Sequence, residues 1–217
     1  MPRFFVNRQR SHALFAKEMD AASHVTWEWL SAVLYNIGAV LLIVGSVLFL
    51  PEYEEYGKAA DWMFVAASIL YLTVSCHDCL EIIKNGVDEN QRIMDLSAAY
   101  VYVCGAALFI VGSALFFPDV GKDFAAGWCF IIESVCFLIG ACINVLQIWE
   151  SPDKLTTQYA NLEALSFVVG SSFFVSASVP YTYDLTSVAD ATLIYGLSAI
   201  LYIIGSSLFL VGGMLNM

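Results

Sequence analysis

Glu133 is the strongest candidate for a functional residue, because it is a carboxylate inside an otherwise apolar run that could bind an ion or a proton. It lies five residues after Trp128, which places it about one and a half helical turns below a residue typical of a membrane interface. An ionisable side chain at that depth is costly and is a functional candidate by default. Three interpretations are open: an ion- or proton-binding site, a hydrogen-bonded group that locks helices together, or a residue exposed at the mouth of a helix bundle.

A second candidate is the run Cys76-His77-Asp78-Cys79. Two cysteines at this spacing with a histidine between them suggest metal or redox chemistry, but one such motif supplies too few well-placed ligands. The position that corresponds to Asp78 in a later, similar segment is Asn144, which favours a polar helix end. We therefore expect no metal and no cofactor. No nucleophile has a histidine and an acid arranged around it, so we expect no catalytic residues and no enzyme.

Membrane-spanning helices must position these residues. Hydrophobic residues make up 59% of the chain and charged residues 13%, whereas a soluble domain carries about a quarter charged residues. Six apolar segments reach the ~20 residues that a bilayer requires: about 28–50, 60–83, 95–117, 124–148, 160–180 and 189–214. Lipid offers the backbone no hydrogen-bond partners, so each segment must be a helix. The expected fold is an all-α, polytopic integral membrane protein with six transmembrane helices.

Internal repeats indicate that the six helices form three antiparallel hairpins. GAVLLIVGSVLFLP at 38–51 returns as GAALFIVGSALFFP at 105–118, and shorter fragments, GSSFF and GSSLF, begin at Gly170 and Gly205. We expect the third copy to be the most diverged, with Gly170-Ser171 opposite Gly45-Ser46 and Gly112-Ser113. The predicted organisation is a basic N-terminal segment at 1–25 and hairpins at 26–90, 91–155 and 156–217.

The two segments of each hairpin also carry a family resemblance. G-A-x-L-F-I-V-G-S-x-L-F-F in the first helix, followed by W-x-F-x-x-x-S-x-x-Y/F-L in the second, resembles the YrhK-like membrane domain, a short two-helix unit. The resemblance covers about 28–214 as three tandem copies. It implies a small integral membrane domain of undetermined biochemistry and brings no catalytic residues with it.

Recurrent small residues predict where the helices approach one another. Several glycines lie seven residues apart, on one face of a helix, and small residues let membrane helices pack closely. We interpret the following as helix-packing positions: Gly38, Gly45, Ser46, Gly105, Gly112, Ser113, Gly170, Ser171, Gly205 and Gly212. The alternative is that the glycines line a pore for a solute.

The distribution of charge predicts orientation. Seven basic residues lie on the side of the N-terminus, namely Arg3, Arg8, Arg10, Lys17, Lys84, Arg92 and Lys154, and two lie opposite, Lys58 and Lys122. Both termini are therefore expected in the cytosol or its equivalent, whether the membrane is the plasma membrane or an organellar one. The opposite side is acidic and includes Asp61; it would attract cations or a basic partner. The net charge of -11 argues against nucleic acid as a partner.

Two functions fit these features. The expected function is that of a non-catalytic accessory or scaffold subunit, in contact with lipid and with other membrane protein subunits, or with further copies of itself. The alternative is a small channel or transporter for ions, protons or solutes, with Glu133 as its ionisable site. The first is favoured because transporters usually show broken helices and several charges near mid-membrane. The N-terminal segment fits an amphipathic helix on anionic lipid, a transit peptide or a simple basic tail.

Overall fold

The computed structural model describes residues 21–85, 89–148, 154–183 and 188–215, and nearly all of these residues are helical. The six long helices are α2 (Ala21–Leu48), α3 (Gly57–Asn85), α4 (Glu89–Phe116), α5 (Asp123–Ile148), α6 (Lys154–Ser178) and α7 (Val188–Leu215). Two short 3-10 helices, η1 (Pro51–Tyr56) and η2 (Val179–Thr182), follow α2 and α6. All six predicted helices are present, and each is long and apolar enough to cross a membrane. The predicted segment 1–25 lies outside the described residues except for its last five.

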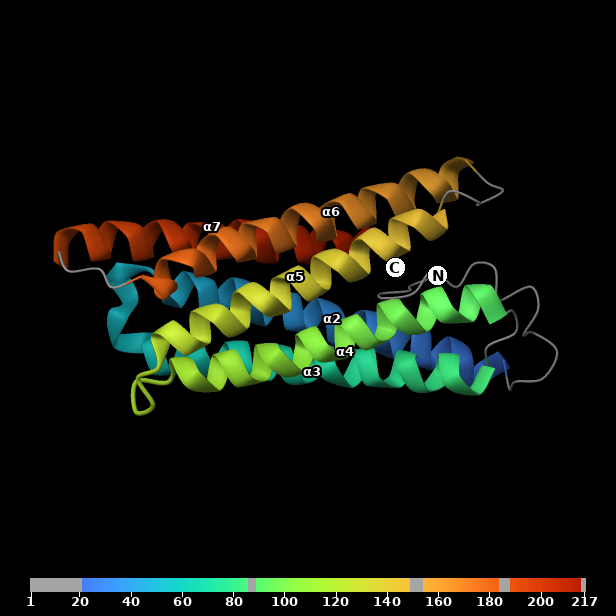
Figure 1. Cartoon of the computed structure of the whole chain (residues 1–217), viewed down its shortest axis with the longest axis horizontal. Coiled ribbons are helices and arrows are strands. Elements are labelled where there is room, and N and C mark those ends of the chain that lie inside the picture. Colours follow the sequence, from blue (N-terminus) through green and yellow to red (C-terminus); the bar gives the residue numbers. More distant parts are fainter. Residues whose placement is uncertain (1–20, 86–88, 149–153, 184–187, 216–217) are drawn as a thin grey trace.

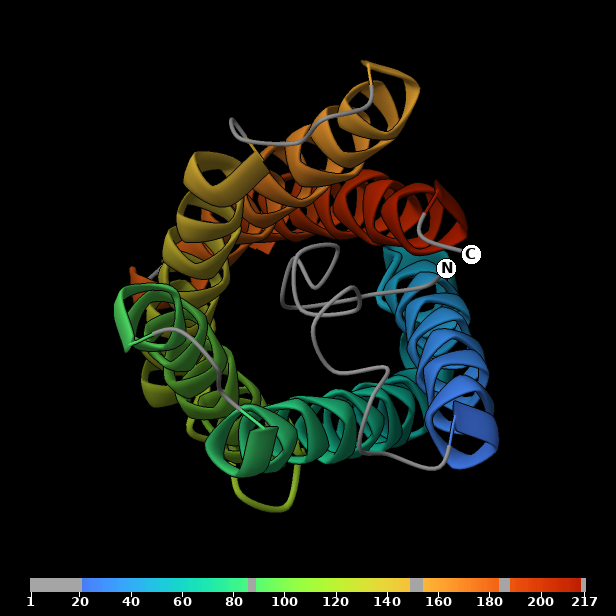
Figure 2. The same ribbon diagram turned by 90° about the vertical axis from the view of Figure 1, so that its right-hand side faces the viewer.

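The six helices stand side by side as a closed ring (Figures 1 and 2). Each helix packs against its neighbours in sequence, and α7 packs against α2, which closes the ring. The beginning of α2 and the end of α7 lie at one end, here termed the terminal end. The opposite end, termed the proline end, carries Pro51, Pro118 and Pro180. Helix α2 ends three residues before Pro51 and α4 ends two residues before Pro118, since proline cannot continue a helix and restricts the residue before it.

Each helix turns a seam of buried residues, spaced alternately three and four apart, toward the interior of the ring. Small and large side chains alternate along these seams: Ala32, Tyr35, Ala39, Leu42 and Ser46 in α2; Ala99, Tyr102, Ala106, Phe109 and Ser113 in α4; Ala164, Phe167, Ser171, Phe174 and Ser178 in α6. This spacing keeps the seam on one face of a helix. A large side chain next to a small one lets facing helices interdigitate.

Aromatic rings from five helices fill the middle of the ring. The centroids of Phe64 in α3 and Tyr202 in α7 are 5.9 Å apart, and those of Phe109 in α4 and Phe174 in α6 are 6.5 Å apart. Phe130 of α5 lies 6.0 Å from Phe64. Neither α3 and α7 nor α4 and α6 are adjacent in the ring, so these contacts cross its interior. These five side chains, termed the aromatic plug, therefore occupy the interior of the ring at this level.

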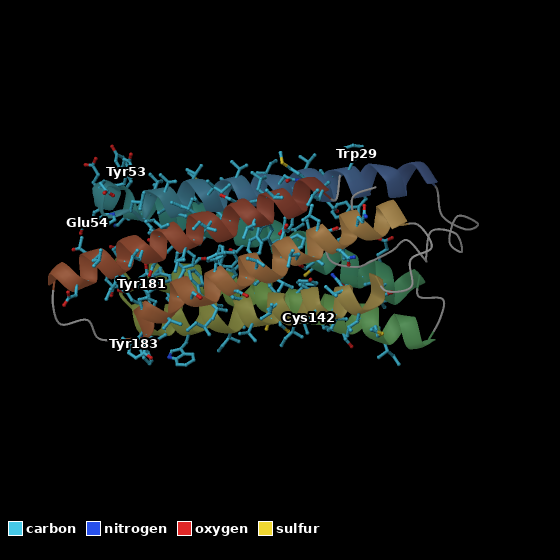
Figure 3. All side chains as sticks on the ribbon, turned by 90° about the horizontal axis from the view of Figure 1, so that it is seen from above. Trp29, Tyr53, Glu54, Cys142, Tyr181 and Tyr183 are labelled. Carbon is cyan, nitrogen blue, oxygen red and sulfur yellow. The ribbon has the colours of Figure 1, made fainter. Side chains whose placement is uncertain are left out.

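The outer surface of the ring is apolar along its length. Large exposed side chains include Trp62, Phe124, Trp128, Leu193 and Met214. Figure 3 shows Trp29 toward the terminal end, and Tyr53 and Glu54 at the proline end. A surface of this kind suits contact with lipid, whereas a soluble protein rarely exposes so large an apolar area.

Candidate functional site

Glu133 lies inside the ring, close to the middle of α5. It is ten residues from the start of this helix, or about 15 Å along a helix of about 39 Å. Its exposed fraction is 1%, which argues against a residue exposed at the mouth. The Ser134 hydroxyl donates a hydrogen bond to Glu133 Oε1 at 3.0 Å. Among the described residues, Glu133 Oε2 has no hydrogen-bond partner and the carboxyl group has no ion-pair partner.

Three hydroxyl groups lie near the Glu133 carboxyl group. One is that of Ser134, which donates to it, and the others are those of Tyr71 and Tyr202. The predicted repeat pairs Glu133 with Ala67 in α3 and Ser198 in α7, and both of these small residues are buried. Within the described part of the chain, the Ser198 hydroxyl group has no hydrogen-bond partner.

Three further acids lie closer to the interior than the sequence suggested. The prediction that Asp61 belongs to an exposed acidic surface is wrong, because its exposed fraction is 2%. The reason is its spacing: Asp61, Phe64 and Ser68 belong to the interior seam of α3, and Asp78 lies on the same seam and is buried. The spacing of Asp61, Phe64 and Ser68 at three and four residues could have predicted this burial from the sequence.

Glu163 lies deeper in its helix than the predicted span indicates. That span begins at about residue 160, whereas α6 begins at Lys154, so Glu163 lies about two and a half turns inside the helix. There its carboxyl group interacts electrostatically with the hydroxyl groups of Tyr35 and Tyr102. The helix is longer than its apolar portion, which is why the sequence placed this residue near its start.

Together these side chains form a series of ionisable groups along the interior of the ring. The order of these groups from the proline end is Asp61, Tyr181, Tyr202, Glu133, Tyr71, Tyr35 and Glu163. The rings of Tyr35 and Tyr71 stack with their centroids 4.7 Å apart. We term these groups the ionisable series. Asp123 at the start of α5 joins it beside Asp61. The series passes the aromatic plug at Tyr202, which belongs to both.

A small cavity lies beside the ionisable series, with space for about one water molecule. Its lining residues are Tyr35, Tyr71, Tyr102, Phe137, Phe167, Ser171 and Phe209. The Ser171 hydroxyl group has no hydrogen-bond partner within the described residues, so a water here would have a polar contact. Such a water could bridge hydroxyl groups that are too far apart for a direct hydrogen bond.

The glycines that the sequence marked as helix-packing positions all face the partner helix of their own hairpin. A Cβ atom at Gly38 would lie 2.6 Å from the Tyr71 ring, and one at Gly112 would lie 2.6 Å from the Phe130 ring. The other predicted glycines face their partners as follows: Gly45 meets Phe64, Gly105 meets Cys136 and the backbone of Glu133, Gly170 meets Phe209, Gly205 meets Phe174, and Gly212 meets Phe167. These glycines therefore lie where two helices approach most closely.

The predicted serines behave in two ways. The hydroxyl groups of Ser46 and Ser113 donate to the carbonyl oxygens of Leu42 and Phe109, at 2.7 and 2.8 Å. These bonds stay within one helix, as expected for a serine in an apolar setting. Ser171 makes no such bond within the described residues and faces the cavity instead.

Comparison with known proteins identifies one family. The model of the YrhK-like proteins matches residues 25–83 and 94–148, which together are more than half of the chain. The first segment contains most of the α2–α3 hairpin and the second most of the α4–α5 hairpin. No curated protein and no solved structure matches the chain.

Proposed function

The chain belongs to the YrhK-like protein family, and we propose that it is an integral membrane protein that moves protons through the interior of its helix ring. The observation that carries this proposal is the position of Glu133, buried near the middle of α5 with an oxygen that lacks a partner among the described residues. Ionisable side chains in this setting are rare because they are costly, and chains of them are typical of proton pathways.

The packing of the interior favours protons over larger species. The aromatic plug crosses the ring, and the cavity beside the ionisable series has room for about one water molecule. A solute or hydrated ion does not fit through such an interior, whereas a proton needs only hydroxyl groups, carboxyl groups and bridging waters. Tyr202 and Tyr71 lie on either side of Glu133 in the ionisable series. Glu133 would therefore receive the proton on one side and release it on the other.

Glu133→Gln should reduce proton flux at least about tenfold in proteoliposomes that contain a pH-sensitive dye and carry an imposed pH gradient. Glutamine keeps the size and hydrogen bonding of glutamate but cannot release a proton. Asp119→Asn is the matched control, because Asp119 has a side chain 77% exposed at the proline end and should keep full flux. Undiminished flux in Glu133→Gln would remove Glu133 from the pathway. No flux in the wild-type protein would refute the proposal.

The proposed orientation places the terminal end in the cytosol or the equivalent compartment. It rests on the excess of basic residues at this end. An impermeant amine reagent applied to the opposite side of oriented vesicles should modify Lys58 and Lys122, which are exposed at the proline end. The lysines expected on the cytosolic side, Lys17, Lys84 and Lys154, should stay unmodified until the vesicles are opened. The reverse pattern would invert the topology.

We further propose that 156–217 is a third, diverged copy of the hairpin. The hydroxyl group of Ser178 donates to the carbonyl oxygen of Phe174 at 2.7 Å, as Ser46 and Ser113 do to the carbonyl four residues before them. This bond supports Ser178 as their counterpart. The register differs from the sequence-based pairing, which used Ser171, by seven residues or two helical turns.

A scaffold subunit remains the second candidate, since aromatic side chains cross the interior of the described helices and their outer face is apolar around the ring. A partner subunit could lie against any of these exposed faces. The flux measurement separates the two functions. Flux that Glu133→Gln abolishes is incompatible with a purely structural role, whereas absence of wild-type flux would favour the scaffold.

A further inference from the structure

Three potential metal ligands converge near the C-terminal end of α3. The ligand atoms of His77, Asp78 and Glu81 all lie within 4.8 Å of one another. His77 and Glu81 are four residues apart and thus share a helix face, with His77 Nδ1 3.9 Å from Glu81 Oε2. From this geometry we propose that the three side chains bind one divalent transition-metal ion. Ligand atoms about 2.0–2.2 Å from an ion require the three side chains to move closer together when the ion binds.

The surroundings hold the imidazole in place and leave a route to it. The Trp27 ring of α2 stacks on the His77 ring, with centroids 3.7 Å apart and an interplanar angle of 30°. This stacking restricts rotation of the imidazole ring. The His77 side chain is 37% exposed and that of Glu81 13%, so an ion can reach the site from outside. Asp78 is buried beneath them.

Electrostatics favours a cation at this position. Helix α3 ends at Asn85, so Glu81 lies about one turn from its C-terminus, where the helix dipole is negative. Carboxylate oxygens such as those of Asp78 and Glu81 are common ligands of divalent cations. Along α3, Asp78 lies seven residues beyond Tyr71, the nearest member of the ionisable series on this helix, or about 10 Å.

The donor set indicates the class of metal. One imidazole nitrogen and two carboxylate oxygens suit Mn²⁺, Fe²⁺ or Zn²⁺, whereas Mg²⁺ and Ca²⁺ prefer oxygen ligands alone. The thiols of Cys76 and Cys79, which first drew attention to this run, are not part of the converging group. Glu81 is the third member of the group instead. The sequence did not indicate it, because it lies outside the Cys76–Cys79 motif. Three ligands from one helix leave coordination positions for water. The site is therefore open, unlike a structural site in which protein ligands fill every position.

The test is to titrate Mn²⁺ into the full-length, metal-free protein in detergent. Binding is measured as the loss of the electron paramagnetic resonance signal of free Mn²⁺. We expect one ion per chain, with the fluorescence of Trp27 quenched by it. Asp78→Asn and Glu81→Gln should each weaken binding by about tenfold or more, the scale at which even contacts outside the ligand set act. Zn²⁺ should displace Mn²⁺ from the same site.

Asp119→Asn is the control for non-specific binding to surface acids, and its affinity should equal that of the wild type. The Trp27→Phe variant should retain the ion and lose the fluorescence change, which assigns the signal. Size-exclusion profiles of all variants establish that they remain folded. Absence of saturable 1:1 binding by both Mn²⁺ and Zn²⁺ would overturn the proposal. Unchanged affinity in the folded Asp78→Asn, Glu81→Gln double variant would do the same.

Discussion

Phe130→Ala should destabilise the protein by about 3–5 kcal/mol, the usual cost of truncating a buried phenylalanine. Phe130 is almost completely buried, and its ring centroid lies 5.0–6.3 Å from those of Phe64, Phe109, Phe116 and Tyr202. These four rings come from three other helices, so the substitution removes contacts across the whole interior. The closed ring holds its helices in place. The neighbouring helices can therefore move only slightly into the cavity that the truncated side chain leaves.

The thermal midpoint in detergent measures this effect. For a chain of this size we expect a fall of roughly 10 °C. Phe124→Ala is the matched control because it makes the same change on the same helix at a position 62% exposed on the outside. Its effect should stay within about 0.5 kcal/mol. Equal losses from the two variants would show that the interior is not filled by the aromatic plug.

Gly205→Ala should be the second most damaging change, at about 1–3 kcal/mol for an overpacked site. A Cβ atom at this position would lie 2.7 Å from the Phe174 ring and 3.0 Å from the backbone oxygen of Gly170. The ring of Phe174 can turn, but the backbone oxygen can move only if α6 and α7 separate. The two helices therefore cannot keep their present distance.

Gly57→Ala separates this steric effect from the general effect of glycine on a helix. Beyond its chain neighbours and its own helix backbone, no atom lies within 4 Å of the Cβ position at Gly57. Gly57 begins α3 with helical backbone angles that alanine adopts readily, so alanine there reduces the entropy of the unfolded chain without strain. We expect Gly57→Ala to raise the thermal midpoint or leave it unchanged. If Gly205→Ala raised it as well, the close approach of α6 and α7 would be contradicted.

The sequence predicted the six helices because long apolar runs leave the backbone one way to satisfy its hydrogen bonds in lipid. It was less accurate at the polar helix ends. Helix α6 begins at Lys154, six residues before the predicted span, since hydropathy does not register a polar first turn. The closure of the ring by α2 and α7 could not be predicted. Contacts between elements so distant in sequence leave no local pattern.

The candidate site was predicted only where a residue broke an apolar run. Glu133 stood out for that reason, and the structure places it inside the ring. Asp61 did not stand out, because it follows a cluster of acids next to Pro51 and was grouped with them. Its burial depends on the alternate three- and four-residue spacing that continues through Phe64 and Ser68, and on a ring whose interior that spacing faces. A hydropathy profile carries neither piece of information.

The contact between α7 and α2 also has a consequence for how the protein is made. A ribosome delivers α2 and α3 first, with Asp61 and Asp78 already on one face of α3. That face gains its remaining cover only when the other helices are inserted, and the gap between α2 and its last neighbour closes with the 28 residues of α7. Until α7 has been made, these carboxyl groups lie on a helix face that the remaining helices have not yet enclosed.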